Sequence, residues 1–446
     1  MKPIGLFLLL TFLTANSFCQ QIFHDARFAK IKQIENGYIS LIKGANDNEL
    51  KKFLVNKFKG YYVEGIALHD NEGKFIWVRA FDNRILFDVK FENNKVFVLN
   101  ADWLNNKVNS SAVLYETVLD LNGKFLNENK ISDIKSNVPN SRIQGFYDDI
   151  GQIWEWTNWE YHKSILINNL EIIGGNNNNI RITNHSTGKT YTYFIKGENL
   201  KVLTHDVYKN KIGFIISGNR IALEKDTIKI NGNILLEFET SGNIINAKSI
   251  ATNGVNIEHL EIINDEFFIG GSFKGNDTLK FESAVYFLEK TLKSPKNRFR
   301  DESARNGFVA SLNDSLNLNW IQILKSEYDV NLESMSVLNK TIAVGLEYKD
   351  FVNINGMEIF SLKDSSEYEY SDAALILFDI NGEINSVERL IGNGYEKIGA
   401  FLMDNKLILF GDFLYTMKVF DIELNDPSKN SCSFLIFKGD ETIGKE

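Results

Sequence analysis

The stretch Phe308–Leu346 decides the fold, and it reads FVASLNDSLNLNWIQILKSEYDVNLESMSVLNKTIAVGL. An apolar segment, Phe308–Leu312, is followed by a polar turn and a second apolar segment that ends at Ile323. After a spacer, Asn339 and Lys340 separate two further short apolar segments. Short apolar runs joined by turns of this kind predict antiparallel β-hairpins.

Weaker copies of the second hairpin recur along the chain. Each has a short apolar strand, a turn rich in Asn, Asp and Lys, whose Asn and Asp tolerate positive φ, and another apolar strand. The copies are Ile31–Gly44, Val89–Asn100, Ile143–Thr157, His205–Ser217, Leu260–Gly271, Met335–Gly345 and Ala400–Gly411. The first and last turns, at Asn36 and Asn405, are 369 residues and six intervals apart, so the mean period is about 61 residues. This period exceeds the ~40–50 residues of common propeller blades, and longer loops between strands would account for the excess.

A second kind of strand lies between these hairpins. It occurs at Val63–Leu68, Leu114–Leu119, Tyr191–Ile195, Ile234–Phe238, Phe308–Leu312, Ala374–Phe378 and Ser433–Phe437. The first hairpin has no such strand before it, and the last such strand has no hairpin after it. These complementary ends predict that the C-terminal strand pairs with the N-terminal segment. The expected fold is therefore an all-β propeller of seven four-stranded blades, with six or eight blades as the alternatives, in which closure leaves no long exposed sheet edge. A pair of antiparallel β-sandwiches is the alternative, but it does not predict the complementary ends.

Composition sets the limits on domain organisation and on partners. The chain has 446 residues, of which 43% are hydrophobic, so it can bury a large core. Length alone suggests two or three domains of ~100–200 residues, whereas a closed repeat architecture keeps such a chain in one domain. The formal net charge of −9 disfavours nucleic acid, which usually requires a basic surface.

The N-terminus has the pattern of a secretory signal peptide. Lys2 precedes the apolar run Ile4–Leu13, which is too short to span a bilayer, and a small and polar region follows. We expect residues 1–20 to be removed by cleavage after Cys19 or Gln20, which leaves residues 21–446 as a single propeller domain. Lipidation at Cys19 is the less favoured alternative, because the preceding Phe18 is large.

The rest of the chain agrees with an extracytoplasmic protein that depends on packing. No later segment is long and apolar enough to cross a membrane. Without Cys19 the only cysteine is Cys432, so no intramolecular disulfide can form. We expect a secreted, periplasmic or envelope location.

The repeat resembles a known family. The order of a strand, Asp-x-Asn-Gly, a strand with Trp, a spacer and a hairpin ending in Gly-x-Phe is similar to the secreted bacterial β-propeller repeats (SBBP-type). The residues that carry the resemblance are Asp379–Gly382, Trp77, Trp320, Gly271–Phe273 and Gly411–Phe413. It covers most of the chain after residue 20 and is strongest from about Asn231 onward. The resemblance implies an extracytoplasmic propeller.

One aromatic run is the candidate ligand-binding surface. In the sequence IWEWTNWEY, Trp154 and Trp156 would point to one face of a strand, and Trp159 and Tyr161 follow near its end. Such side chains can stack on sugar rings or anchor a peptide. Packing between blades is the alternative interpretation.

Other motifs favour structure over chemistry. Trp77 and Trp320 follow a Gly-type turn at equivalent positions, which predicts a structural role for both. Asp120–Gly123 and Asp379–Gly382 resemble fragments of calcium loops but lack the further oxygen ligands, so we interpret them as hairpin turns.

No catalytic residue, metal or cofactor is predicted. The histidines are scattered, and the sequence contains no nucleophile elbow, Walker loop or dinucleotide-binding motif. Carboxylates at Asp102, Glu155, Glu347 and Asp412 lie near hairpin ends and could converge on a propeller axis, as in propeller glycosidases.

Two functional hypotheses follow. The favoured one is a secreted, non-enzymatic propeller that acts as a monomeric binding scaffold for a protein or glycan at the envelope or outside the cell. The alternative is a carbohydrate-active hydrolase or lyase whose carboxylates meet at the propeller axis.

Overall fold

The structure is a computed structural model that consists of β-strands and turns. It describes residues 19–24, 26–34, 36–44, 63–102, 112–134, 163–167, 170–175, 179–184, 188–223, 226–239, 241, 244–251, 255–274, 278–281, 284–287, 305–326, 329–349, 351–361, 371–392, 396–403, 406–425 and 431–438. This part of the chain contains no helix. No helix in it is therefore long and apolar enough to cross a membrane.

The first two sheets are antiparallel meanders of four strands that follow sequence order. One consists of β2 (Ala26–Ile34), β3 (Gly37–Gly44), β4 (Val63–His69) and β5 (Phe75–Asp82). The other consists of β6 (Arg84–Glu92), β7 (Lys95–Asp102), β8 (Ala112–Asp120) and β9 (Phe125–Ile134). The predicted hairpins Ile31–Gly44 and Val89–Asn100 both lie in these sheets, as the turn residues indicated.

The next sheet has seven strands, because one long strand belongs to two meanders. Its strands are β10 (Lys163–Ile167), β11 (Leu170–Gly175), β12 (Asn179–Asn184), β13 (Lys189–Tyr208), β14 (Lys211–Leu223), β15 (Asp226–Glu239) and β16 (Ile244–Ala251). Residues 189–194 of β13 pair with β12, and residues 195–208 pair with β14.

The predicted strand Tyr191–Ile195 is present, but it is part of the longer strand β13 and not a separate short strand. The sequence Gly197–Asn199 has the composition of a turn. In the structure it is accommodated by shifts in register on either side of Glu198, and the strand continues. The predicted hairpin Ile143–Thr157 lies outside the described residues.

The C-terminal half contains two six-stranded sheets and one four-stranded sheet. The first is formed by β17 (Val255–Ile263), β18 (Glu266–Lys274), β21 (Arg305–Leu312), β22 (Leu318–Lys325), β25 (Phe351–Ile354) and β26 (Met357–Phe360). The second is formed by β23 (Val330–Leu338), β24 (Thr341–Tyr348), β27 (Asp372–Asp379), β28 (Ile384–Gly392), β31 (Thr416–Val419) and β32 (Ile422–Asn425). The last is formed by β29 (Glu396–Met403), β30 (Lys406–Leu414), β33 (Ser431–Lys438) and β1 (Cys19–His24).

Inserted hairpins account for much of the long sequence period. The hairpin β25–β26 lies between β24 and β27 in sequence, yet it pairs with β22 of the preceding sheet. In the same way β31–β32 lies between β30 and β33 and pairs with β28. A third hairpin, β19 (Thr278–Phe281) with β20 (Ala284–Phe287), lies between β18 and β21 and contacts β16. The sequence predicted only loops in these places.

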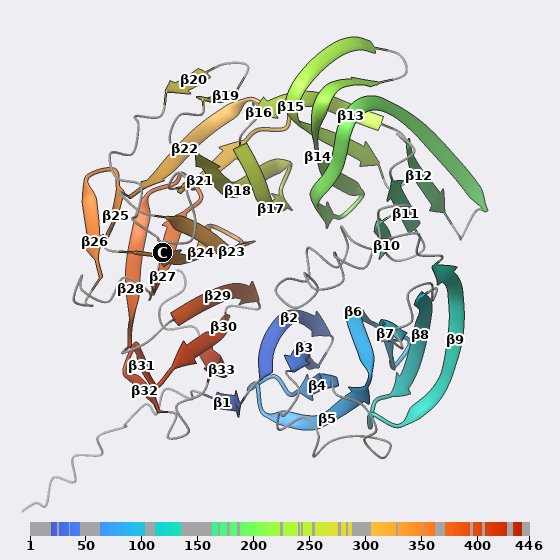
Figure 1. Cartoon of the computed structure of the whole chain (residues 1–446), viewed down its shortest axis with the longest axis vertical. Helices are drawn as coiled ribbons and strands as arrows, with labels where there is room; N and C mark the ends of the chain where they lie inside the picture. The colour runs from blue at the N-terminus through green and yellow to red at the C-terminus, as the bar shows by residue number, and fades with distance from the viewer. Residues whose placement is uncertain are drawn as a thin grey trace, which may run out of the picture.

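The two ends of the described chain meet. β33 pairs antiparallel with β1, from Cys19 opposite Phe437 to His24 opposite Cys432. The predicted pairing of Ser433–Phe437 with the N-terminal segment is therefore present. Figure 1 shows the sheets following one another around a common centre, as in a β-propeller, with the sheet of β2–β5 beside that of β29, β30 and β33.

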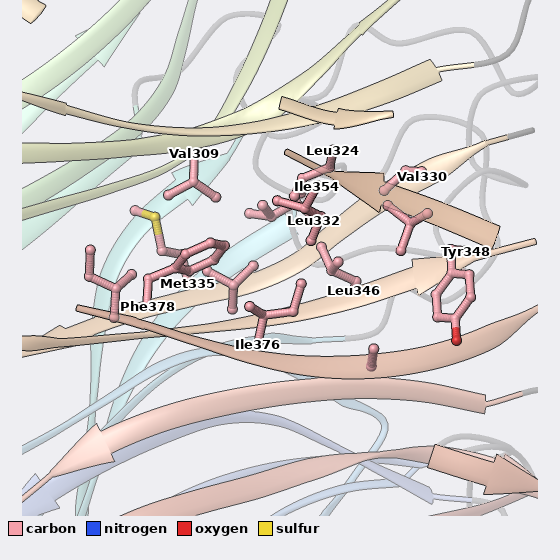
Figure 2. Close-up of a cluster of buried hydrophobic side chains, with 14 of the residues drawn as sticks. Val309, Leu324, Val330, Leu332, Met335, Leu346, Tyr348, Ile354, Ile376 and Phe378 are labelled. Atoms are coloured by element: carbon pink, nitrogen blue, oxygen red, sulfur yellow. The ribbon is translucent and has the colours of Figure 1, made fainter. Parts of the chain in front are cut away.

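The hydrophobic core lies between consecutive sheets. In Figure 2, Val309 and Leu324 of one sheet face Leu332, Met335 and side chains of the next sheet. Another buried cluster joins the sheet of β2–β5 to the sheet of β29, β30 and β33; it includes Phe28, Tyr38, Ile408, Leu435 and Phe437. Burial of one such side chain contributes about 1.5–3 kcal/mol, so packing between sheets is the main source of stability.

Candidate functional site

The predicted aromatic surface is not placed by the structure. Trp154, Trp156, Trp159 and Tyr161 lie outside the described residues, and so does Glu155. The candidate site must therefore be built from other residues.

Trp77 and Trp320 have the structural role that the sequence predicted. Trp77 lies on β5 and Trp320 lies on β22, and each donates its indole N–H to a turn of the next sheet. Trp77 bonds the carbonyl oxygen of Leu121 at 2.7 Å, and Trp320 bonds that of Ile380 at 2.9 Å. Each ring also covers the turn glycine, so that a Cβ on Gly382 would lie 2.7 Å from the Trp320 ring. These contacts lock one sheet to the next.

The Asp-x-Asn-Gly segments form hairpin turns, as interpreted. Asp120 Oδ1 accepts hydrogen bonds from the backbone N–H of Asn122 and Lys124 at 2.9 and 2.8 Å. Asp379 Oδ1 makes the same pair of bonds with the turn that ends at Glu383. One carboxylate oxygen in each turn is therefore used by its own backbone. In the part of the chain that the structure describes, no three His, Cys, Asp or Glu side chains gather as a metal site.

The first strands of successive sheets lie near the centre and are linked through side chains. β13 contacts β17, β17 contacts β23, and β23 contacts β29 (Figure 1). Three side-chain oxygens accept bonds from backbone N–H groups of the following first strand: Asp206 from Ile262 (2.6 Å), Ser334 from Ala400 (2.7 Å) and Ser336 from Leu402 (3.1 Å). The His259 ring also bonds the carbonyl oxygen of Leu332 at 2.9 Å. These bonds fix the spacing of the first strands.

A bulge recurs in several of these first strands. The pairing register shifts at residue 29 in β2, 87 in β6, 203 in β13, 258 in β17 and 333 in β23. A bulged residue leaves the regular ladder and re-aims its side chain. In β17 and β23 this residue is a glutamate, Glu258 or Glu333.

Glu333 belongs to a charged cluster that joins two sheets, which we call the Glu–Lys cluster; it consists of Glu333, Glu347, Lys397 and Ser371. Lys397 Nζ lies 3.4 Å from Glu333 Oε1 and 3.4 Å from Glu347 Oε2. Ser371 Oγ donates to Glu347 Oε1 at 2.5 Å. The side chains of Glu333, Glu347 and Lys397 are 25%, 12% and 33% exposed, so the cluster is half-buried but reaches solvent.

The pKa values of the two carboxyl groups in the cluster are shifted in opposite directions. Burial raises the pKa of Glu333 to about 7, and a hydrogen bond to Glu347 adds to this effect against the attraction of Lys397. Burial alone would raise the pKa of Glu347 as well, but Lys397 and hydrogen bonds from Glu333 and Ser371 outweigh it and lower the pKa. Burial opposes the charge of Lys397, and the two carboxylates nevertheless raise its pKa. Near neutral pH the cluster therefore exchanges one proton, at Glu333.

A related polar group lies at the equivalent place in the preceding sheet. Glu258 Oε1 accepts hydrogen bonds from Asn256 Nδ2 at 2.5 Å and from Ser272 Oγ at 3.3 Å. Since β17 contacts β23, two neighbouring sheets present acceptor oxygens near the centre. Chemically, this arrangement can bind a cationic group or several hydroxyl groups, and Glu333 can give or take a proton.

Sequence reasoning found only part of this cluster. Glu347 was among the carboxylates expected near hairpin ends, and Asp412 lies on β30, where its backbone is paired with that of Lys397. Asp102 is the last residue of β7. Glu333, Lys397 and Ser371 were not singled out. The bulge that aims Glu333 gives no composition signal, and the cluster joins residues about 60 positions apart.

Comparison with known proteins gives likeness in fold only. No protein-family model matches the sequence, and no curated protein matches it. Among solved structures, the β-propeller domain of the Trilobed protease from Pyrococcus furiosus is 10% identical, with 94% of this chain and 98% of that chain covered and a TM-score of 0.43. BamB from Moraxella catarrhalis is 11% identical, with 94% and 98% covered and a TM-score of 0.37. The β-propeller domain of Cps50 (Swd1) from Myceliophteria thermophila is 7% identical, with 93% and 99% covered and a TM-score of 0.39.

Proposed function

We propose that this chain is a secreted, non-enzymatic β-propeller that binds a protein or glycan ligand at the cell envelope or outside the cell. In this proposal residues 21–446 form one domain of seven four-stranded blades. The blades begin with β2, β6, β10, the second half of β13, β17, β23 and β29, and β1 completes the last by pairing with β33. The pairing of β1 with β33 and the packing of Leu435 and Phe437 against Phe28 and Tyr38 support closure.

The Glu–Lys cluster is the observation that carries the binding role. Its groups are half-buried and fixed by hydrogen bonds, and they lie where first strands of two sheets meet. A pre-organised polar group on rigid strands loses little conformational freedom when it binds a ligand. The aromatic residues Trp154–Tyr161 remain the proposed stacking surface.

Binding of the mature protein to a glycan array and to envelope extract tests this proposal. We expect binding by the wild type that is reduced at least tenfold in Glu347→Ala, because removal of that carboxylate leaves Lys397 without its better acceptor. A Trp156→Ala variant tests the aromatic surface separately. Equal binding by the wild type and Glu347→Ala would move the site away from the cluster.

The alternative, a carbohydrate-active hydrolase, is favoured by one observation. Glu333 has a raised pKa and Glu347 has a lowered one. In some glycosidases a carboxyl group with a raised pKa acts as general acid beside a second carboxylate that stays ionised. However, Glu333 and Glu347 hydrogen-bond each other, and glycosidase carboxyl groups stand ~5–5.5 Å or ~6.5–9.5 Å apart to admit the sugar or a water. Hydrolysis of a chromogenic glycoside that is lost in Glu333→Gln would reverse this ranking.

Secretion is part of the same proposal. Cleavage after Cys19 or Gln20 would leave Gln21–His24 paired with β33, so the mature chain would keep this contact. Mass spectrometry of the mature protein should show an N-terminus at residue 20 or 21. A chain that retains Met1 would contradict secretion by cleavage of a signal peptide.

A further inference from the structure

We propose that the Glu–Lys cluster is a pH-sensitive switch in which protonated Glu333 is hydrogen-bonded to Glu347, whereas ionised Glu333 separates from Glu347 and turns toward solvent. The cluster then carries a different charge on the two sides of neutral pH, so the affinity of the site for a charged ligand depends on pH. Only this effect on affinity rests on the function proposed above, because the switch itself belongs to the chain without ligand.

Two carboxyl groups in the cluster share a single ammonium group. Lys397 Nζ lies 3.4 Å from Glu333 Oε1 and 3.4 Å from Glu347 Oε2, so both carboxyl groups contact the same nitrogen atom. Two carboxylates this close repel each other, and one cation does not balance both, so one of them is favoured to hold a proton. Proximity alone therefore predicts that the two groups titrate as a coupled pair.

The contacts of the two carboxyl groups decide which one holds the proton. Glu347 is 12% exposed and both of its oxygens contact donors, since Ser371 Oγ donates to Oε1 at 2.5 Å and Lys397 approaches Oε2. Hydrogen bonds of this kind favour the ionised form. Glu333 is 25% exposed and has the Lys397 contact at one oxygen, so it takes the proton. The pKa of Glu333, raised to about 7, and the lowered pKa of Glu347 agree with this assignment.

The strands that pack against β23 carry further titratable or charged side chains. They are Glu258, His259 and Glu261 on β17, Glu266 and Lys274 on β18, Arg305 on β21, Glu347 and Tyr348 on β24, and Glu396 and Lys397 on β29. Of these groups, Glu347 and Lys397 are the two whose charge shifts the pKa of Glu333. The switch is therefore a property of the Glu–Lys cluster and not of the wider surroundings.

The backbone around Glu333 is anchored on both sides, so we expect ionisation to move the side chain and not the strand. On one side, the carbonyl oxygen of Leu332 contacts His259 Nε2 at 2.9 Å. On the other side, Ser334 Oγ accepts the backbone N–H of Ala400 at 2.7 Å. Loss of the proton removes the hydrogen bond that Glu333 donates, and the two like charges then repel each other. Because Glu333 lies at the bulge and is already 25% exposed, a change of rotamer is enough to reach water.

The switch changes the charge that the site presents to a ligand. Below neutral pH the ionised Glu347 balances Lys397, and the cluster is neutral. Above neutral pH the ionised Glu333 adds one negative charge, since Lys397 keeps its proton because the two carboxylates raise its pKa. A cationic ligand group should therefore bind more tightly above neutral pH, and an anionic group less tightly.

Carbon NMR of the mature wild type without ligand tests the hydrogen-bonded state, with the side-chain carboxyl carbon of glutamate isotopically labelled. Glu333→Gln identifies the Glu333 signal by its loss, and we expect this signal to titrate at about pH 7 in the wild type. In Glu347→Gln the midpoint should fall by about one pH unit or more, because the charge that opposes ionisation of Glu333 is removed. Glu358→Gln, at an exposed position on β26, is the control and should leave the midpoint unchanged.

The solvent accessibility of the same carbon tests the release step and needs no substitution at Glu347. A neutral gadolinium chelate in the solvent speeds the relaxation of exposed nuclei. Its effect on the Glu333 carboxyl carbon should be larger at pH 8 than at pH 6 by roughly twofold, because the ionised side chain has turned toward water. The carboxyl carbon of the exposed Glu358 should respond equally at both pH values.

Two results would overturn the proposal. One is an unchanged midpoint in a Glu347→Gln variant that thermal unfolding shows to be folded, because Glu333 would then titrate without contact with Glu347. The other is an equal effect of the chelate on Glu333 at pH 6 and pH 8, and this measurement on the wild type decides if Glu347→Gln does not fold. A switch that behaves as expected in a chain that binds no ligand would support this inference and contradict the function proposed above.

Discussion

Replacement of Glu333 by Gln should change how stability depends on pH. The pKa of Glu333 is about 7 in the folded chain, whereas its ordinary value, which applies to the unfolded chain, is 4.5. Between these values the folded chain holds a proton that the unfolded chain releases. Stability from this group is therefore complete below about pH 4.5 and is lost as the pH rises through 7.

The size of the effect follows from the same values. A shift from 4.5 to about 7, at about 1.4 kcal/mol per pKa unit, corresponds to roughly 3 kcal/mol. The Glu333 side chain is 25% exposed, so solvent screening reduces this to about 1–2 kcal/mol. Glutamine stays neutral and can still donate to Glu347, so Glu333→Gln should become more stable than the wild type by this amount at pH 8 and match it near pH 4.5.

Urea unfolding at pH 4.5, 6, 7 and 8 measures the difference between wild type and variant at each pH. Glu358→Gln, at an exposed position on β26, is the control and should run parallel to the wild type. The same pH dependence in Glu333→Gln and the wild type would refute the account of the Glu–Lys cluster.

Three further predictions concern the contacts that join the sheets. Gly382→Ala should lower the free energy of unfolding by about 2–4 kcal/mol, because a Cβ there meets the Trp320 ring and φ is +85°. The control Gly356→Ala has a similar φ but open space around the Cβ, so urea unfolding should show a loss of only about 1 kcal/mol. Ser334→Ala should cost about 1–3 kcal/mol, since it leaves the buried N–H of Ala400 without its acceptor, whereas Ser386→Ala at an exposed site should be neutral by the same assay. Burial lowers the pKa of His69 to about 4, so the stability that the neutral ring contributes is complete above pH 6.5 and is lost as the pH falls toward 4. The difference in thermal unfolding midpoint between wild type and His69→Gln should therefore shrink as the pH falls from 6.5 to 4.

Much of the fold could be predicted because its signals are local. The turn residues at Asn94 and Asn339 have φ near +55°, as a tight hairpin requires, and the strands on either side are apolar. The roles of Trp77 and Trp320 followed from their equivalent positions after a turn, which has Gly73 before Trp77 and Leu316, with a φ of 57°, before Trp320. The complementary ends of the repeat led to the pairing of β33 with β1.

The inserted hairpins could not be predicted by the same reasoning. Their strands, such as Phe351–Ile354 and Thr416–Val419, have four residues each, and they pair with a sheet other than their own. Pairing of that kind depends on which outer strand lies nearby and not on local composition. β13 shows the reverse case, because the turn-like residues Gly197–Asn199 are accommodated as irregularities within one long strand.

The site was harder to predict than the fold, because proximity in it is set by packing between sheets. Lys397 and Glu333 meet only because β29 contacts β23. The proton affinity of Glu333 then depends on burial, which the sequence does not report. The role of the buried His69 also depends on packing. Ser40 Oγ lies 2.7 Å from its Nε2 and Gly73 O lies 3.2 Å from its Nδ1, so both ring nitrogens are hydrogen-bonded within the core.

The most direct test of the central claim is the affinity of the mature wild type for whatever envelope protein or glycan it captures, measured beside Glu347→Ala and the control Glu358→Gln. If the Glu–Lys cluster is the ligand-binding site of a scaffold, affinity should fall at least tenfold in Glu347→Ala alone, with no turnover of the ligand. Equal affinity in all three proteins, or conversion of the ligand by the wild type, would contradict the claim.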